Sequence, residues 1–280
     1  MGDTSLITNA KNTWCSGCGN FAILNAIKAV FGALIDEGTP REDIVMVSGI
    51  GCHAKIADYI NVNSFYSLHG RVVPVCEAIK LANPKLKVIG FAGDGDTYGE
   101  GLEHLVFAAK RNVDISIVIH NNSVYGLTTG QYTPTSPLGF KGRSTPGGTK
   151  ELPMNPLELM LASHASFIAR GYSHGIELLK KMLKEAITHK GFSLVDILQV
   201  CVTFYNMYEN YNARVYELKD HDPSDGSRAL EKIKEWDYNS DAKIPLGVFY
   251  KKERPVFEFP PKIKEIDLDA KIKGLLNDRA

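Results

Sequence analysis

The sequence predicts an α/β protein with a doubly wound, mostly parallel sheet. Short apolar runs alternate along the chain with segments whose apolar residues recur at helical spacing. Two of these runs end in polar, glycine-containing loops, which is typical of the ligand-binding edge of an open α/β sheet. The chain has no internal repeat and no low-complexity tract. Because strands that alternate with helices favour parallel pairing through crossovers, the whole pattern indicates one such sheet.

The N-terminal part of the pattern contains two helices and then a strand–helix–strand unit. The expected elements are a helix at 21–36, a strand at 44–47, a helix at 73–81, a strand at 88–92, a helix at 102–109 and a strand at 115–119. In a right-handed βαβ unit the loops after both strands emerge at the same edge of the sheet. We therefore expect the loops that begin at Gly93 and Asn121 to lie side by side.

The remainder of the chain continues the alternation and then becomes irregular. We expect a loop rich in proline and glycine at 132–150, a helix at 156–165, a strand at 166–169, a helix at 176–189 and a strand at 193–200. Beyond residue 203 one helix is plausible at 226–236. We expect 1–203 to form the ligand-binding domain and 204–280 to be an extension that packs on the core or on a partner.

Composition favours an intracellular enzyme subunit. With 280 residues, 44% of them hydrophobic, the chain is long enough to bury a large core. The formal net charge is zero, which gives no reason to expect binding to nucleic acid or to a membrane surface. No apolar run reaches membrane-spanning length, and the polar residues 1–5 do not resemble a signal peptide. Five cysteines are poorly explained by disulfides, so a reducing, cytoplasmic location is expected.

Four cysteines form a candidate metal site. Cys15 and Cys18 belong to one Cys-x-x-Cys loop, whereas Cys52 and Cys201 follow distant apolar runs. Four thiolates can hold an iron–sulfur cluster or a structural zinc ion, and the cysteines alone favour neither. A thioredoxin-like redox pair is a third interpretation. Cys76 lies on an apolar helix and is expected to be a small buried side chain.

A second motif combines a Gly-Asp-Gly turn with an Asn-Asn loop. Asp94 and the side-chain oxygen of Asn122 are hard ligands that suit Mg²⁺, and Gly93 and Gly95 let backbone N–H groups approach a diphosphate. An ordinary turn is the simpler alternative. A dinucleotide fingerprint does not fit, because Tyr98 stands where the third glycine would be. Together the two halves resemble the thiamine diphosphate signature.

The two motifs and their order resemble the β subunits of 2-oxoacid:ferredoxin oxidoreductases. The matching segments are 13–20, 49–53, 68–71, 93–96, 125–131 and 201–203. The resemblance implies a thiamine diphosphate-binding fold over 1–203, with Mg²⁺ bound by Asp94, Asn122 and the carbonyl of Val124. It also implies a 4Fe-4S cluster on Cys15, Cys18, Cys52 and Cys201. The implied cofactor-binding residues are Gly93, Asp94, Gly95, Asp96, Asn122, Val124, Tyr125, Gly126, Leu127 and Thr128.

The implied reaction is the coenzyme A-dependent oxidative decarboxylation of a 2-oxoacid to acyl-CoA and CO₂. Electrons would pass singly from the thiamine site to the cluster and on to ferredoxin. 2-Oxoglutarate, pyruvate and broad specificity all stay open as substrates. His69 and Arg71, beside the expected thiamine site, are candidate catalytic residues. Lys55 is either a guide for an anionic substrate or a surface lysine, and His53 is a weaker candidate.

One group that the reaction needs is expected from elsewhere. Thiamine enzymes use a carboxylate against the aminopyrimidine ring, and in the resembling family it comes from a second domain that this chain is too short to include. The resemblance therefore implies an α subunit, in an α₂β₂ assembly, and a β chain that is inactive alone. The main alternative is a non-redox thiamine decarboxylase or carboligase, which would not need the four cysteines. An electron-transfer module and a zinc-stabilised binding protein explain fewer of the motifs.

Overall fold

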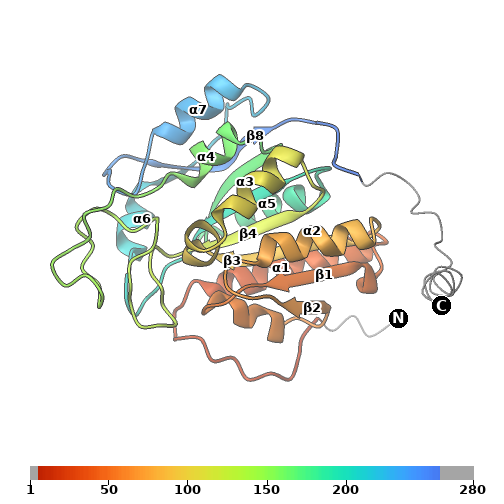
Figure 1. Ribbon diagram of the computed structural model, residues 1–280, viewed down its shortest axis with the longest axis horizontal. Coiled ribbons are helices and arrows are strands. Elements are labelled where there is room, and N and C mark those ends of the chain that lie inside the picture. Colours follow the sequence, from red (N-terminus) through yellow and green to blue (C-terminus); the bar gives the residue numbers. More distant parts are fainter. Residues whose placement is uncertain (1–5, 259–280) are drawn as a thin grey trace, which may run out of the picture.

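A sheet of eight strands runs through the computed structural model, which describes residues 6–258 (Figure 1). The strand order is β2-β1-β3-β4-β6-β5-β8-β7. The strands are β1 (Ile44–Ser48), β2 (Asn63–Tyr66), β3 (Lys87–Gly93), β4 (Ser116–Asn121), β5 (Phe167–Tyr172), β6 (Ser193–Leu198), β7 (Val215–Glu217) and β8 (Ile244–Lys251). Every neighbouring pair from β2 to β5 is parallel, and β8 pairs antiparallel with β5. The doubly wound, mostly parallel fold predicted from the sequence is confirmed.

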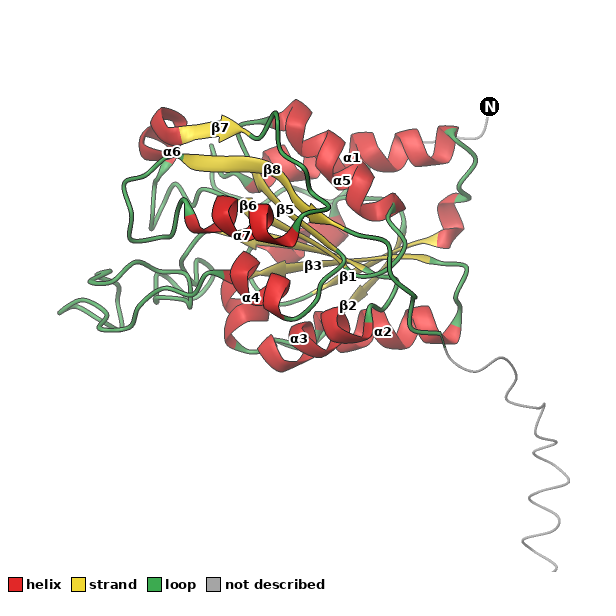
Figure 2. Ribbon diagram, turned by 90° about the horizontal axis from the view of Figure 1, so that it is seen from above, coloured by secondary structure: helices red, strands yellow, loops and turns green. Residues whose placement is uncertain are grey.

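Helices cover both faces of this sheet (Figure 2). They are α1 (Asn20–Asp36), α2 (Val72–Ala82), α3 (Leu102–Arg111), α4 (Pro156–Ala162), α5 (Ile176–Thr188), α6 (Tyr208–Arg214) and α7 (Gly226–Lys234). Short helical turns are η1 (Arg41–Asp43), η2 (His53–Asp58) and the π-helical η3 (Gly95–Gly99). Helices α1 and α5 pack on one face, and α2, α3 and α4 pack on the other. Among the described residues no helix is long and apolar enough to cross a membrane.

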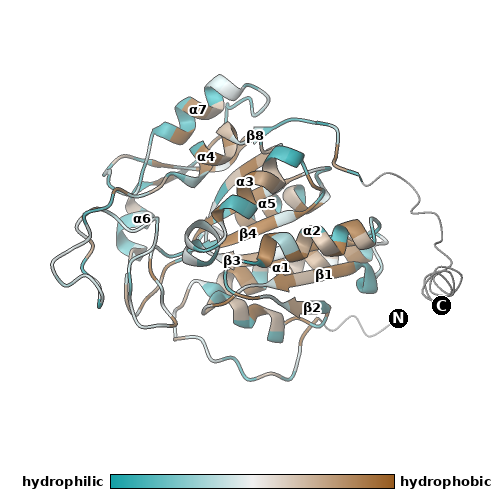
Figure 3. Ribbon diagram, viewed as in Figure 1, coloured by the Kyte–Doolittle hydropathy of each residue, from teal (hydrophilic) through white to brown (hydrophobic). Residues whose placement is uncertain are grey.

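The central strands are apolar because they are covered on both faces. Strands β4, β5 and β6 are buried along their whole length, and Figure 3 shows the apolar character of the inner strands. Strands buried on both faces have continuous apolar sequences, without the alternation of a half-exposed sheet. This is why the runs at 88–92, 115–119 and 193–200 were visible in the sequence.

The segment after residue 203 takes a larger part in the fold than the sequence indicated. The helix expected at 226–236 is present as α7, but β7 and β8 were not expected. Strand β8 extends the sheet at β5 and contributes Phe249 to the core. Trp236 and Tyr211 pack with side chains from β5 and β6 in a third apolar cluster. Residues 204–258 therefore pack on the core and also add to the sheet.

Candidate active site

The candidate residues meet because four parallel strands end at one edge of the sheet. Strands β1, β3, β4 and β6 run in the same direction, so the loops that follow them adjoin. These loops begin at Gly49, Asp94, Asn122 and Gln199. They line two cavities, which we call the β3–β4 cavity and the cysteine cavity. The β3–β4 cavity is lined by Ile50, Gly51, Cys52, His53, His69, Gly93, Asp94, Gly95, Asp96, His120, Asn122, Val124, Tyr125, Gly126, Leu127 and Thr128.

Asp94 is a buried carboxylate held by hydroxyl groups. Its Oδ2 accepts hydrogen bonds from Thr133 Oγ1 at 2.5 Å and Thr135 Oγ1 at 2.8 Å, and its Oδ1 accepts from the Asn122 amide at 3.4 Å. Burial raises the pKa of Asp94, and these hydrogen bonds oppose the rise. The side-chain oxygen of Asn122 faces the same loop, where it accepts from the Val124 amide at 3.0 Å. A divalent cation would stabilise this buried charge, so the donor set fits Mg²⁺.

The glycines of the turn allow side chains to pack directly on its backbone. A Cβ on Gly95 would lie 2.2 Å from the ring of Tyr125, and one on Gly93 would lie 2.9 Å from Nδ1 of His53. The Tyr125 hydroxyl donates a hydrogen bond to the Gly95 carbonyl at 3.1 Å. The space that a Cβ would take at Gly93 and Gly95 is therefore filled by His53 and Tyr125, which explains why both positions require glycine.

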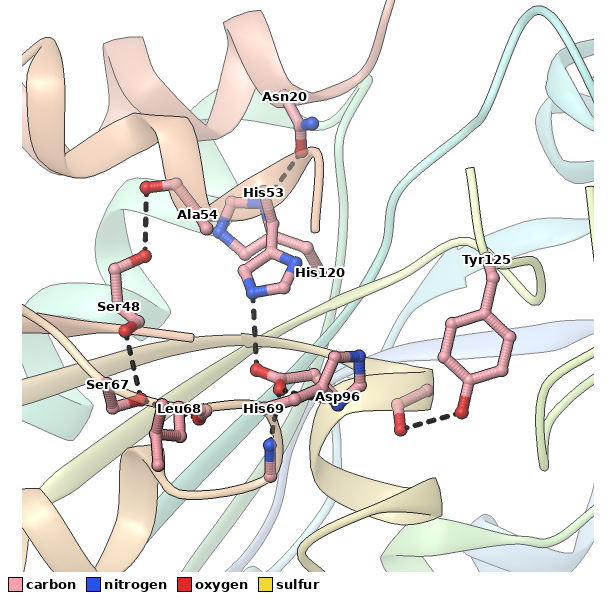
Figure 4. Close-up of polar contacts among 12 residues, drawn as sticks. Asn20, Ser48, His53, Ala54, Ser67, Leu68, His69, Asp96, His120 and Tyr125 are labelled. Atoms are coloured by element: carbon pink, nitrogen blue, oxygen red, sulfur yellow. Dashed lines mark hydrogen bonds and ion pairs between the residues drawn. The ribbon is translucent and has the colours of Figure 1, made fainter. Parts of the chain in front are cut away.

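Asp96 faces two histidines (Figure 4). Its Oδ2 lies 3.4 Å from Nε2 of His53 and its Oδ1 lies 3.3 Å from Nδ1 of His69. The Gly70 amide also donates to Oδ1 at 2.7 Å. His53 is buried, whereas 37% of the His69 side chain is exposed. Neither histidine nitrogen forms a hydrogen bond with the carboxylate, so Asp96 is a buried charge close to both rings, and the sequence did not indicate that His53 faces it.

His120 is a cavity residue that the sequence motifs did not single out. It lies in β4, it is buried, and its Nδ1 is 2.7 Å from Oδ1 of Asn20 (Figure 4). Because an amide oxygen only accepts hydrogen bonds, Nδ1 carries the proton and Nε2 carries a lone pair. Nε2 has no hydrogen-bond partner among residues 6–258. Burial, together with the nearby His53, holds the pKa of His120 well below its usual value, so the ring is neutral. In the sequence, the signal that could have identified His120 as a site residue is a histidine in an otherwise apolar strand.

Arg71 lines neither of the two cavities. Its Nη1 donates to the carbonyls of Gly70 at 3.2 Å and Glu100 at 2.9 Å. These bonds join the start of α2 to the loop before α3. A catalytic role for Arg71 stays a prediction, whereas the structure brings His69 into the cavity wall.

The four candidate cysteines line the second cavity together. The cysteine cavity is lined by Thr13, Trp14, Cys15, Cys18, Asn20, Cys52, Lys55, Asn122, Gly126, Leu127, Gln199, Cys201, Val202, Thr203 and Phe204. All four are free thiols. A Cβ on Gly126 would lie 3.7 Å from Cys52 Sγ and 3.8 Å from Cys201 Sγ, so these two thiols flank one glycine. Across residues 6–258 no three His, Cys, Asp or Glu side chains are grouped closely enough to share a single metal ion.

Two thiols of the cysteine cavity, those of Cys18 and Cys52, are disfavoured as thiolates when no cation is near. Burial raises the pKa of Cys18 to about 11, and the neighbouring cysteines add to the rise. Burial also raises the pKa of Cys52, against the opposing charge of Lys55. A metal centre would supply the missing positive charge, so thiols in this environment fit an iron–sulfur cluster. Cys76, by contrast, is fully buried in the core, as predicted.

Comparison with known protein families gives two matches that together cover most of the chain. Residues 49–197 match the model of the thiamine pyrophosphate enzyme, C-terminal TPP binding domain. Residues 201–262 match the model of the C-terminal part of the pyruvate ferredoxin oxidoreductase β subunit. The first match contains the β3–β4 cavity loops, and the second begins at Cys201.

Curated relatives agree with these matches over nearly the whole chain. The chain is 43% identical over 263 residues to the 2-oxoacid:ferredoxin oxidoreductase 1, subunit beta, of Aeropyrum pernix, a match that covers 89% of this chain and 80% of the relative. The chain belongs to the β subunits of the 2-oxoacid:ferredoxin oxidoreductases. The β subunit of Saccharolobus solfataricus is 42% identical over 259 residues, covering 86% of this chain and 82% of the relative. This β subunit is thus part of an oxidoreductase.

A solved structure extends the likeness to three dimensions. The 2-oxoglutarate:ferredoxin oxidoreductase from Magnetococcus marinus, solved with 2-oxoglutarate, coenzyme A and succinyl-CoA bound, superposes with a TM-score of 0.84 at 32% sequence identity. The match covers 97% of this chain and 89% of the other. The thiamine diphosphate-binding fold expected for the chain is therefore present.

Proposed function

We propose that this β subunit binds thiamine diphosphate with Mg²⁺ in the β3–β4 cavity and a 4Fe-4S cluster in the cysteine cavity. The enzyme would carry out coenzyme A-dependent oxidative decarboxylation of a 2-oxoacid and pass single electrons to ferredoxin. One observation carries the proposal: the two cavities share a wall, made of Cys52, Asn122, Gly126 and Leu127. A site for decarboxylation and a site for electrons thus adjoin in one chain.

The residues that would hold the thiamine cofactor follow from the cavity. Asp94, Asn122 and the Val124 carbonyl would bind Mg²⁺, and the backbone around Gly93 and Gly95 would face the diphosphate. Tyr125, Gly126, Leu127 and Thr128 line the remaining wall. When bound, thiamine diphosphate supplies the electron sink for breaking the bond to the carboxylate, and the cluster accepts one electron at a time.

His69 is placed to hold or move a proton. Oδ1 of Asp96 lies 3.3 Å from Nδ1 of His69 without forming a hydrogen bond, so the carboxylate acts on the ring only through its nearby charge. The side chain lines the cavity and is partly exposed. An imidazole in a cavity wall can accept a proton and return it to a reacting group. Asp96 would serve the proposed site as the buried carboxylate beside His69.

The relatives support the proposed partners and substrates. Because the chain belongs with β subunits, we propose an α subunit that supplies the ring-activating carboxylate, in an α₂β₂ assembly in the cytoplasm. Within this chain the part up to residue 203 would hold the cofactors, and 204–258 would pack on the core or on the partner; the rest of the predicted extension, 259–280, lies outside the described residues. The 2-oxoglutarate synthase subunit KorB of Archaeoglobus fulgidus is 39% identical over 190 residues, 68% of this chain and 70% of the relative. 2-Oxoglutarate and pyruvate are the proposed substrates.

The test is anaerobic purification of the β subunit with its α subunit, followed by analysis of bound iron, sulfide, zinc and thiamine. We expect about four irons and one thiamine diphosphate per β chain. We also expect coenzyme A-dependent dye reduction with 2-oxoglutarate or pyruvate. Zinc without iron, or iron without thiamine, would contradict the proposal.

A further inference from the structure

Gln199 touches both cofactor sites. It is the first residue after β6, it is only 1% exposed, and it lies in the wall of the cysteine cavity. Its Oε1 accepts a hydrogen bond from Nδ2 of Asn122 at 3.0 Å. Its Nε2 donates to the Val200 carbonyl at 2.8 Å and to Sγ of Cys18 at 3.4 Å. One amide therefore joins a proposed Mg²⁺ ligand to a proposed cluster ligand.

Backbone groups at both ends fix the direction of these hydrogen bonds. The Val124 amide can only donate, so the atom of Asn122 that faces it is Oδ1, and Nδ2 points at Gln199. The Val200 carbonyl can only accept, so the atom of Gln199 that faces it is Nε2. Flipping the Gln199 amide would set oxygen against oxygen at Val200 and nitrogen against nitrogen at Asn122. The contact with Cys18 is therefore an N–H donated to sulfur.

We propose that Gln199 is a positioning residue that couples the two sites, an inference that rests on the proposed function. An N–H donated to a ligand sulfur stabilises the added negative charge of a reduced cluster more than it stabilises the oxidised one. Gln199 therefore raises the reduction potential of the cluster that Cys18 would bind. Through its oxygen it also holds Asn122 with Oδ1 toward the metal loop.

Two substitutions separate these effects. Gln199→Met keeps the length of the side chain and removes both the donor and the acceptor. Gln199→Glu keeps an oxygen for Asn122 and removes the N–H donor. Asn83→Leu is the control, because that exposed amide accepts a hydrogen bond from the Lys85 backbone N–H after α2 and lines neither cavity.

The first readout is the reduction potential of the cluster, from a redox titration followed by electron paramagnetic resonance on the anaerobic αβ complex. At a fixed applied potential we expect Gln199→Met to lower the reduced-to-oxidised ratio about fivefold, which is about 40 mV for a one-electron couple. Gln199→Glu should shift the potential at least as far in the same direction. Asn83→Leu should have the same reduction potential as the wild type.

The second readout is the dissociation constant of Mg²⁺ in the presence of thiamine diphosphate. We expect severalfold weaker binding in Gln199→Met and recovery toward the wild type in Gln199→Glu, which a residue that only fills space would not show. Reduction potentials unchanged in both variants would overturn the inference. If Gln199→Met does not retain its iron, the reduction potential of Gln199→Glu alone tests the inference. A wild-type complex without iron or thiamine would instead contradict the proposed function itself.

Discussion

Replacing Thr133 with valine tests the proposed Mg²⁺ site at Asp94. The substitution keeps the shape of the side chain and removes the hydroxyl that donates to Asp94 Oδ2 at 2.5 Å. A hydrogen bond to a charged group contributes about 1.5–3 kcal/mol. Each 1.4 kcal/mol corresponds to about a tenfold change in a binding constant, so the dissociation constant of Mg²⁺ should increase by at most roughly 10–100-fold.

The loss should depend on pH, because protons and Mg²⁺ compete for the same carboxylate. Burial already raises the pKa of Asp94, and removing a donor to its ionised form raises this pKa further. Mg²⁺ affinity is present above that pKa and falls as the pH drops through it, so the variant should lose affinity at a higher pH than the wild type. We expect the ratio of wild-type to Thr133→Val affinity for Mg²⁺ to increase as the pH is lowered.

The assay is calorimetric titration of the αβ complex with Mg²⁺ in excess thiamine diphosphate. Thr188→Val is the control, because that hydroxyl donates to the Lys184 carbonyl on the outer face of α5. Equal Mg²⁺ affinity of Thr133→Val and the wild type at pH 6 would refute the assignment of Asp94 as a ligand.

Three further predictions address other parts of the site. Cys201→Ser should lose iron and the visible absorbance of the cluster, whereas Cys76→Ala should keep both; equal iron loss would contradict the assignment. Asp96→Asn should lower kcat by about 10² while KM stays nearly constant. A change in KM alone would contradict the proposed role of the Asp96 carboxylate beside His69. Burial raises the pKa of Asp196 to about 6, so the wild type should lose up to about 3 kcal/mol of unfolding free energy as the pH rises from 4 to 7. The stabilisation from protonated Asp196 is present below the ordinary carboxyl pKa and is lost as the pH rises through about 6. Urea titrations of Asp196→Asn should show a flatter dependence of the unfolding free energy on pH. A dependence identical to that of the wild type would contradict this prediction.

The central strands and the two loop motifs were predictable because burial on both faces leaves a strong sequence signal. Strand β8 was not, since Pro245 and Gly247 lie within it and both residues weaken a strand pattern. Its position depends on pairing with β5, which is a tertiary contact. Strand β2 is a four-residue edge strand with every side chain exposed, so it carries no apolar run.

The sequence was sufficient to predict which loops form the site, but not which side chains in those loops contact one another. The spacing of Asp94 and Asn122 placed them at one sheet edge. No sequence pattern indicates that Asp96 faces two histidines, or that His120 contributes a lone pair to the cavity wall. Gln199 lies within the strand predicted at 193–200, and its contacts with Asn122 and Cys18 arise because residues distant in sequence converge there.

The most direct test of the proposed function is whether a 2-oxoacid alone reduces the cluster in the anaerobic αβ complex. We predict that adding 2-oxoglutarate or pyruvate produces the paramagnetic signal of a reduced cluster in the wild type. In Asp94→Ala the oxoacid should give no signal, while dithionite should still reduce the cluster. An equal oxoacid-induced signal in Asp94→Ala, or no signal in an iron- and thiamine-loaded wild type, would contradict the coupling of the two adjoining cavities.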